Sequence, residues 1–566
     1  MKFELGEHEA AVDRRIAQLT GDGAPAKLWS RDAGWWGGDA ERQKSVANRL
    51  GWLDVAAQMR ERVDDLRAFG DDVREQFDNC VLLGMGGSSL APEVLRESIP
   101  ARSGWPRLYV LDTTDVATIE SVTRKINPAR TLFFVSSKSG TTIEALSLFA
   151  HFHALVEKAK GATAGENFVA ITDAGTPLQD LAREHEFRRV FTNPGDIGGR
   201  YSALSYFGLA PAAASGIDVA RLLDGALRVA DAARFGGSDG LKLGASLGEL
   251  ARAGRDKCTF ITTKTIEPFG LWVEQLIAES TGKLGRGIVP VAGEPLGTPL
   301  QYGGDRVFVR VRLEGGDNSE LDAMAGAYAG AGQPVITIDL DDPYDLGREF
   351  FRWEFAIAVA GRVLEINPFD EPNVQESKDN TKMVLAEFGR TKTLDSAGID
   401  RGEPVALASA GGEPDADIET ALARLLAQLS AGDYFAITAY VERTVASEET
   451  FAAIRSSVRD TWHTATTLGY GPRFLHSTGQ LHKGGPPEGV FLQVTATDAE
   501  DIAIPNQTFT FGQLKRAQAI GDLQSLEKHG RPALRVHLGA DVPAGLLRLR
   551  RAFESVIEAA GVGGGA

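Results

Sequence analysis

Residues 131–146 read TLFFVSSKSGTTIEAL, an apolar run followed by a turn rich in hydroxyl side chains and then by a helical pattern. The apolar run is typical of a buried β-strand. Over residues 141–160, apolar side chains recur at helical spacing at Leu148, Phe152 and Leu155. The stretch therefore predicts a strand, a polar turn and a helix, the order in which a βαβ unit begins.

A second junction of the same kind precedes it, VLLGMGGSSLAPEVL at residues 81–95. Further apolar runs alternate with amphipathic stretches as far as residue 340 and again after residue 430. Such alternation predicts an α/β fold of doubly wound parallel sheets with helices on both faces. The runs expected to form strands are CVLLG, LYVLD, TLFFVSS, NFVAITD, RRVFTNP, CTFITT, GIVPVAG, RVFVRV, PVITIDL, DYFAITAYV, VFLQVT and LRVHLG.

The chain has 566 residues, too many for a single core, and its pattern divides into four segments. Residues 1–74 predict helices and loops. Residues 75–235 and 240–395 predict two α/β domains in tandem, and residues 396–566 a smaller C-terminal α/β region. The Gly-, Asp- and Pro-rich stretch 394–417 predicts a linker, and the final GVGGGA predicts a frayed end.

Composition argues against several classes of protein. The formal net charge is −17, which opposes non-specific binding to nucleic acid because such binding needs a basic face. No apolar run reaches the ~20 residues that span a bilayer, and the N-terminus lacks the apolar core of a signal peptide. We therefore expect a cytoplasmic protein without nucleic-acid or membrane partners. Cys80 and Cys258 each lie in an apolar run and are expected to be buried thiols.

The turn after the strand at 131–136 offers several donors to an anion. They stand beside a predicted helix N-terminus, where free backbone N–H groups favour negative charge. The alternative is that these residues only cap the helix. Neither the G-x-x-x-x-G-K-[ST] order of a Walker loop nor the G-x-G-x-x-G spacing of a dinucleotide loop is present in the two turns. The donors are Ser136, Ser137, Lys138, Ser139, Thr141 and Thr142.

These two junctions resemble the sugar isomerase (SIS) family of phosphosugar-binding domains. Two such domains in tandem, with the motifs around Arg200, Glu279 and Lys378, resemble the glucose-6-phosphate isomerase family. The resemblance implies a small sugar phosphate as substrate, neither cofactor nor metal, and a homodimer with shared active sites. By the same resemblance the ligand-binding residues are Ser137, Ser139 and Thr142 for the phosphate, Lys138 and Thr141 beside them, and Gly87 and Ser88 for the sugar.

The base candidate is Glu279, in FGLWVEQLIAESTGKLG at residues 269–285. The helical stretch ends near it, and a carboxylate at a helix C-terminus has a raised pKa, as a general base requires. On its own the residue is expected to be an exposed helix-end glutamate. The pattern Gln-x-x-x-Glu-Ser-x-Gly-Lys, however, is similar to the family's base motif, which carries Gln275 into the site together with Glu279.

The cation candidate is Arg200, in DIGGRYSALS at residues 196–205. Two glycines before an arginine suit a backbone that is pressed against a ligand, although a surface arginine beside a turn is the simpler expectation. Gly-Gly-Arg-Tyr-Ser is similar to a family motif, which assigns Arg200 to stabilise an enediolate.

In INPFDEPNVQESKDNTK, Phe369, Asp370 and Lys378 keep the family's interval between Phe-Asp-Gln and a lysine near the ring oxygen. Glu371 stands where the family has the glutamine, which puts a second carboxylate near the chemistry and leaves its role open. Glu144 matches another family site position. It either hydrogen-bonds the ring-opening histidine or faces solvent in the first turn of its helix.

The family's ring-opening histidine lies between the base motif and the Phe-Asp-Gln motif, but no histidine occurs between Glu279 and Lys378. The C-terminal run GPRFLHSTGQLHKGG resembles the family's histidine segment, moved along the chain. We therefore expect His476 to open the ring, with His482 as the second candidate and a loop histidine without a role as the alternative. This order resembles the isomerase half of bifunctional transaldolase–glucose-6-phosphate isomerase proteins, although no transaldolase portion is recognisable in the sequence.

The resemblance predicts reversible isomerisation of glucose 6-phosphate and fructose 6-phosphate through an enediol. Such a reaction needs a base, a cation for the enediolate, an acid–base pair for ring opening and a grip on the phosphate. Two alternatives remain. One is an isomerase for another phosphosugar, such as a mannose phosphate, and the other is a non-catalytic phosphosugar-binding protein, against which Glu279, Arg200 and Lys378 argue together.

Overall fold

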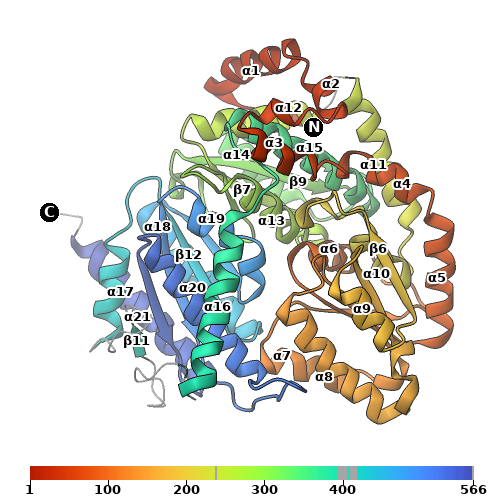
Figure 1. The fold of residues 1–566 in the computed structure, drawn as a ribbon. Helices are drawn as coiled ribbons and strands as arrows, with labels where there is room; N and C mark the ends of the chain where they lie inside the picture. The colour runs from red at the N-terminus through yellow and green to blue at the C-terminus, as the bar shows by residue number, and fades with distance from the viewer. Residues whose placement is uncertain (236–238, 392–393, 395–404, 408–416, 564–566) are drawn as a thin grey trace.

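The computed structural model describes residues 1–235, 239–391, 394, 405–407 and 417–563, and this part of the chain forms three five-stranded sheets (Figure 1). Each of the predicted apolar runs overlaps one strand, and the prediction of doubly wound α/β sheets is confirmed. Most of the expected linker, 395–404 and 408–416, and the last three residues lie outside the described residues.

The first sheet is entirely parallel, in the order β3-β2-β4-β5-β6. Its strands alternate along the chain with helices that cover both faces. The strands are β2 (Asn79–Gly84), β3 (Arg107–Leu111), β4 (Thr131–Ser136), β5 (Phe168–Asp173) and β6 (Arg189–Asn193). The helices are α6 (Leu90–Ser98), α7 (Val116–Lys125), α8 (Ile143–Lys160), α9 (Pro177–Glu184) and α10 (Tyr206–Ala214).

The second sheet has the order β1-β10-β9-β7-β8, and its edge strand β1 (Lys2–Glu4) is antiparallel to β10. The prediction of helices and loops alone for residues 1–74 is therefore wrong at its start, because a three-residue edge strand leaves no apolar period to recognise. The other strands are β7 (Lys257–Thr262), β8 (Val289–Val291), β9 (Arg306–Leu313) and β10 (Val335–Leu340). The helices are α11 (Val219–Arg234), α12 (Asp239–Arg252), α13 (Phe269–Thr281), α14 (Ser319–Gly330) and α15 (Leu346–Val363).

The third sheet repeats the topology of the second, with the order β11-β15-β14-β12-β13 and an antiparallel edge strand, β11 (Val405–Leu407). This short strand lies within the stretch that was expected to be a linker throughout. Its other strands are β12 (Tyr434–Tyr440), β13 (Ala465–Tyr470), β14 (Gly489–Thr495) and β15 (Ala533–His537). The helices are α16 (Pro372–Thr391), α17 (Ile418–Leu426), α18 (Val445–Trp462), α19 (Gly479–Gly484), α20 (Phe511–Lys528) and α21 (Val542–Gly563).

The first two sheets share one contiguous apolar core, to which the N-terminal helices contribute. Leu82 and Phe134 of the first sheet, Val309 of the second and Trp52 of the N-terminal segment all belong to it. The third sheet has its own core, which includes Phe435. Cys80 and Cys258 are buried free thiols, as predicted. The N-terminal helices are α1 (Glu9–Gly21), α2 (Ala24–Trp29), α3 (Ala40–Ala47), α4 (Trp52–Arg60) and α5 (Val63–Gln76).

Helix α16 runs along α20 of the C-terminal region, so it joins the second sheet to the third (Figure 1). A buried ion pair of the second sheet's part, from Arg306 to the Glu294 carboxylate at 2.9 Å, also binds the C-terminal region, because Arg306 donates to the backbone oxygen of Thr464 at 3.1 Å. Glu294 in turn accepts from the backbone N–H of Thr466 at 2.7 Å. The backbone at Thr464 and Thr466 is therefore hydrogen-bonded to a buried ion pair of the second sheet's part.

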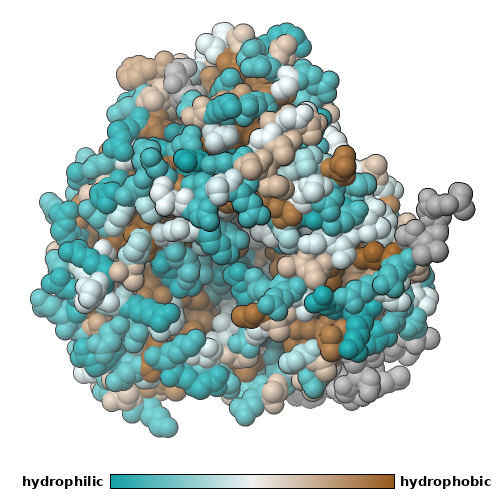
Figure 2. Space-filling view, turned by 180° about the vertical axis from the view of Figure 1, so that it is seen from behind, coloured by the Kyte–Doolittle hydropathy of each residue, from teal (hydrophilic) through white to brown (hydrophobic). Residues whose placement is uncertain are grey.

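The face opposite to that of Figure 1 is mostly polar. Figure 2 shows hydrophilic side chains over most of the face opposite to that of Figure 1, with apolar side chains only in small separate groups. Among the described helices, none is both long enough and apolar enough to cross a membrane.

Candidate active site

The first sheet reverses its strand order at β2 and β4, since β3 lies on one side of β2 and every later strand on the other. In doubly wound sheets, ligands bind outside the carboxyl ends of the strands at such a point. Gly84 and Ser136, at the ends of β2 and β4, are paired in register. Ser136 Oγ donates to the backbone oxygen of Ser88 at 3.0 Å, so the GMGGS and SSKSGTT turns lie side by side.

The hydroxyls of the second turn pair with one another. Ser137 Oγ lies 2.8 Å from Thr142 Oγ1, and Ser139 Oγ lies 2.9 Å from Thr141 Oγ1. Thr142 occupies the N-cap position of α8, but its side chain caps no backbone N–H. Lys138 instead turns to the Asp173 carboxylate and to the backbone oxygen of Gly195. The turn therefore presents hydroxyls at the N-terminus of a long helix, while the ammonium is already paired.

The first turn packs tightly against the segment that carries Arg200. A side chain at Gly87 would place its Cβ 2.0 Å from the backbone oxygen of Gly199, so only glycine fits there. Ser202 Oγ donates to the backbone oxygen of Gly87 at 3.3 Å. The predicted sugar-contacting turn and the Gly-Gly-Arg motif thus form one packed unit.

Glu279 is buried in α13, with 6% of its surface exposed, so the expectation of an exposed helix-end glutamate is wrong. Gln275 Nε2 donates to Glu279 Oε2 at 3.3 Å, and Arg200 Nη1 lies 3.6 Å from the same oxygen. Burial raises the pKa of Glu279 to about 8, and the nearby Arg200 charge only partly offsets it. The dominant cause of the raised pKa of Glu279 is therefore desolvation. The sequence had suggested a different cause, the position of Glu279 at a helix C-terminus.

Arg200 is also buried, at 2% exposed, which contradicts the expectation of a surface arginine. Its guanidinium donates to Ser280 Oγ at 2.8 Å and to the backbone oxygens of Pro368 and Asp370 at 2.8 and 2.9 Å. The Glu371 carboxylate accepts from Arg200 Nη1 at 2.9 Å. These bonds fix the guanidinium beside Glu279. They also bring together the motif around Arg200, the base motif and residues 368–371, which lie far apart in the sequence.

Two lysines lie near Arg200 and Glu279. Lys283, buried in the segment after α13, donates to the Asp370 carboxylate and to the backbone oxygen of Asn367, both at 2.7 Å. Burial and then the Arg200 charge lower the pKa of Lys283 to about 8. Lys378, on the exposed side of α16, has no ion-pair partner among the residues that the structure describes. Its ammonium is close enough to lower the pKa of Glu279.

The C-terminal region supplies a histidine to the site. His476 Nε2 lies 2.9 Å from Glu144 Oε1, and the backbone oxygen of His476 accepts from Gln275 Nε2 at 2.8 Å. Glu144 is 3% exposed and does not face solvent. His482 instead lies in an aromatic environment with Tyr434 and Phe491, and it is 3% exposed. The structure thus brings His476, but not His482, to the predicted site.

Sequence reasoning did not identify three residues that the structure places here: Gln518, Ser280 and Lys283. Gln518, on α20, donates to Glu144 Oε1 at 2.7 Å and accepts from Thr114 Oγ1 at 2.9 Å. Nothing in its helical sequence indicates this contact. Ser280 and Lys283 belong to the base motif, so their positions next to Glu279 were a usable signal. No group of three or more described His, Cys, Asp or Glu side chains is arranged to hold a metal ion.

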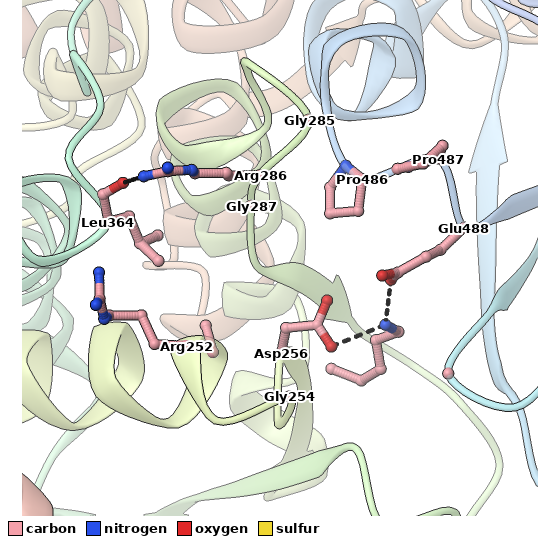
Figure 3. Close-up of a pocket in the computed structure, with 13 residues that line it drawn as sticks. Arg252, Gly254, Asp256, Gly285, Arg286, Gly287, Leu364, Pro486, Pro487 and Glu488 are labelled. Carbon is pink, nitrogen blue, oxygen red and sulfur yellow. Dashed lines mark hydrogen bonds and ion pairs between the residues drawn. The ribbon is translucent and has the colours of Figure 1, made fainter.

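A separate cleft of about 560 Å³ lies where the second sheet meets the C-terminal region (Figure 3). Arg252, Arg286 and Leu364 line one side and Pro486, Pro487 and Glu488 the other. Lys257 bridges the two parts through Asp256 at 2.8 Å and Glu488 at 2.7 Å. None of the predicted site residues lines this cleft.

Comparison with known proteins gives a consistent family assignment. A family model described as phosphoglucose isomerase matches residues 44–236. The glucose-6-phosphate isomerase of Rubrobacter xylanophilus is 31% identical over 361 residues, which cover 55% of this chain and 82% of that protein. A probable glucose-6-phosphate isomerase of Methanococcus maripaludis is 27% identical over 378 residues, which cover 60% of this chain and 84% of that protein.

Solved structures agree on the fold. A hypothetical protein of Thermus thermophilus has a TM-score of 0.58 at 25% identity, over 68% of this chain and 99% of that one. A glucose-6-phosphate isomerase of Chlamydia trachomatis has a TM-score of 0.51 at 24% identity, over 58% of this chain and 74% of that one. Each of these matches leaves about a third of this chain or more without a counterpart.

Proposed function

Because the chain belongs to the phosphoglucose isomerase family, we propose that it interconverts glucose 6-phosphate and fructose 6-phosphate through an enediolate, with Glu279 as the base. The family is one of aldose–ketose isomerases, which sets aside the alternative of a non-catalytic binding protein. The observation that carries the proposal is the buried Glu279 carboxyl, held between the Gln275 amide and the Arg200 guanidinium.

Proton transfer is the central step. Glu279 removes a proton from the carbon next to the carbonyl and returns it to the neighbouring carbon, so that no net proton is consumed. A pKa of about 8 keeps the carboxyl near the point where it both accepts and gives a proton at neutral pH. Gln275 supports this role because its Nε2 binds the carboxylate, while its buried Oε1 accepts no hydrogen bond from a described residue and suits a substrate hydroxyl.

Arg200 stabilises the negative charge that develops on the enediolate. A fixed cation in a site shielded from water acts more strongly than in solution, and it needs no reorganisation during the reaction. The bonds from Arg200 to Ser280, Pro368 and Asp370 hold it in place before substrate arrives.

Ring opening needs a base at the anomeric hydroxyl and an acid at the ring oxygen. His476 Nε2 faces Glu144, so the other ring nitrogen is left to take the hydroxyl proton. Lys378 gives a proton to the ring oxygen as the bond between that oxygen and the anomeric carbon breaks and the carbonyl forms. The hydroxyls of Ser137, Ser139 and Thr142, with Gly87 and Ser88 on the sugar side, hold the substrate meanwhile.

The test is turnover of fructose 6-phosphate to glucose 6-phosphate, with and without EDTA, in the wild type and in Glu279→Gln. Loss of the base should lower kcat by at least about 10²-fold and stop deuterium uptake from D2O. Binding of the unreactive analogue sorbitol 6-phosphate, measured by calorimetry, should change little. Activity that survives EDTA supports a reaction without a metal ion.

Glu274→Gln is the matched control, because burial also raises the pKa of Glu274, which lies earlier on the same helix α13, to about 8. Its turnover should stay near that of the wild type. Full activity of Glu279→Gln would refute the assignment of the base. Faster turnover of mannose 6-phosphate than of glucose 6-phosphate would favour the alternative substrate.

A further inference from the structure

A single 3-10 turn, Arg473–His476, connects β13 to the segment before α19 and carries the proposed ring-opening histidine. Side chains three residues apart in such a turn point to the same side. Arg473 and His476 therefore face the same neighbour, and both contact the first sheet's part of the chain rather than their own.

Arg473 forms a two-pronged ion pair with Asp112, the residue that follows β3. Its Nε lies 2.6 Å from Asp112 Oδ2, and its Nη2 donates to Asp112 Oδ1 at 2.9 Å. The Asp112 side chain is 5% exposed and the Arg473 side chain 20% exposed, so the pair is largely shielded from water. Glu93, on α6, lies 3.9 Å from Arg473 and adds a weaker attraction.

Asp112 also reaches the sugar-contacting turn. Ser89 Oγ, directly after Gly87 and Ser88, donates to Asp112 Oδ2 at 3.3 Å. The same carboxylate thus joins the turn that carries His476 to the turn that faces the sugar. Two-pronged arginine–carboxylate pairs fix geometry as well as supplying energy.

The far end of the 3-10 turn is held by different contacts. The backbone oxygen of His476 accepts from Gln275, and the imidazole meets Glu144. These contacts fix the position of His476 at the end of the turn. The ion pair at Arg473 fixes the position of the first residue of the turn. Phe474 of the turn packs against Tyr440 of the third sheet. Among the described residues at the start of the turn, Arg473 is the one that forms an ion pair with the first sheet's part.

We infer that the ion pair between Arg473 and Asp112 is a positioning pair, which holds His476 in register with the anomeric carbon of the sugar. The inference rests on the proposed function, since it concerns the ring-opening step alone. It follows that loss of the pair slows reactions of cyclic substrates and spares a substrate that is already open.

The experiment compares two ketose phosphates. Fructose 6-phosphate is mostly cyclic, whereas 5-deoxyfructose 6-phosphate lacks the hydroxyl that closes the furanose ring and stays open. Arg473→Lys and Asp112→Asn should each lower kcat/KM for fructose 6-phosphate by about tenfold, the effect of losing a charged hydrogen bond. For the open substrate both variants should stay within about twofold of the wild type. In the His476→Asn background, Arg473→Lys should have no further effect.

Arg548→Lys is the control, because Arg548 pairs with Glu419 inside the C-terminal region, at 2.7 Å. It should leave both substrates unaffected. An equal loss on both substrates, or no loss on fructose 6-phosphate, overturns the positioning role. A wild type without activity on fructose 6-phosphate would instead contradict the proposed function, so the two failures are distinguishable. Melting curves of the variants identify any loss that is due to unfolding.

Discussion

Replacing Glu371 by glutamine should move the pH dependence of turnover to lower pH. Glu371 stands where the resembling family has a glutamine, and its carboxylate bonds Arg200 at 2.9 Å. Arg200 is thereby shared between two carboxylates, because Glu279 lies 3.6 Å from the same nitrogen. The Glu371 charge raises the pKa of Glu279, so its removal should lower that pKa.

The size of the shift follows from the geometry. Both carboxylate oxygens contact one nitrogen, so they are no more than about 6.5 Å apart. The Glu371 side chain is 38% exposed, and solvent screening of this degree reduces the repulsion to about 1 kcal/mol. That energy corresponds to about 0.7 pH unit. With a starting pKa of about 8, the ionised fraction of Glu279 at pH 7 should rise from about a tenth to about a third.

The assay is kcat/KM for fructose 6-phosphate from pH 6.5 to 9.5, in the wild type and in Glu371→Gln. Activity requires the ionised base, so it should fall as pH drops below about 8 in the wild type and below a lower midpoint in the variant. At pH 7 the variant should be about threefold more active. Glu376→Gln, which removes a carboxylate paired with Lys528 and His529, should leave the midpoint unchanged. An unchanged or higher midpoint for Glu371→Gln would refute the coupling.

Two further predictions concern substrate binding and the stability of the fold. Thr142→Val removes a hydroxyl of the turn that is proposed to bind the phosphate, and it should raise KM by about tenfold with kcat nearly constant. A loss confined to kcat would contradict a binding role. Arg306→Met leaves the buried Glu294 without its ion-pair partner and should lower the free energy of unfolding by about 3–5 kcal/mol in urea titration. Adding Glu294→Gln should recover part of this loss, and a cost below about 1 kcal/mol would argue against the pair as an anchor.

The sheets were predictable because their strands are long apolar runs separated by helical patterns. The exceptions share a physical reason. β1 and β11 are three-residue edge strands, which need neither a long apolar run nor an alternating one. β13 reads ATTLGY and is poor in large apolar side chains, so its sequence resembles a turn. Their pairing depends on neighbouring strands that are distant in sequence.

The sequence predicted which residues come together at the candidate site, but not how deeply they are buried or which distant residues they contact. Motif positions correctly grouped Arg200, Glu279 and Glu371, which the structure brings into contact. The sequence did not reveal that burial sets the pKa of Glu279, because exposure depends on how α13 packs. Gln518 was missed for the same reason, since its contact with Glu144 joins two parts of the chain that lie far apart in the sequence. The catalytic roles, the domain limits, the homodimer and the cytoplasmic location stay predictions.

The C-terminal region contributes side chains next to the proposed site. It meets the first sheet's part of the chain through His476, Gln518 and Arg473, and each of these contacts ends on a carboxylate or hydroxyl beside the proposed site. It meets the second sheet's part where the backbone at Thr464 and Thr466 bonds the ion pair of Arg306 and Glu294. A region added only for stability would need no such convergence on one edge of the first sheet. Because no histidine lies between Glu279 and Lys378, this docking is how the same chain brings a histidine to Glu144.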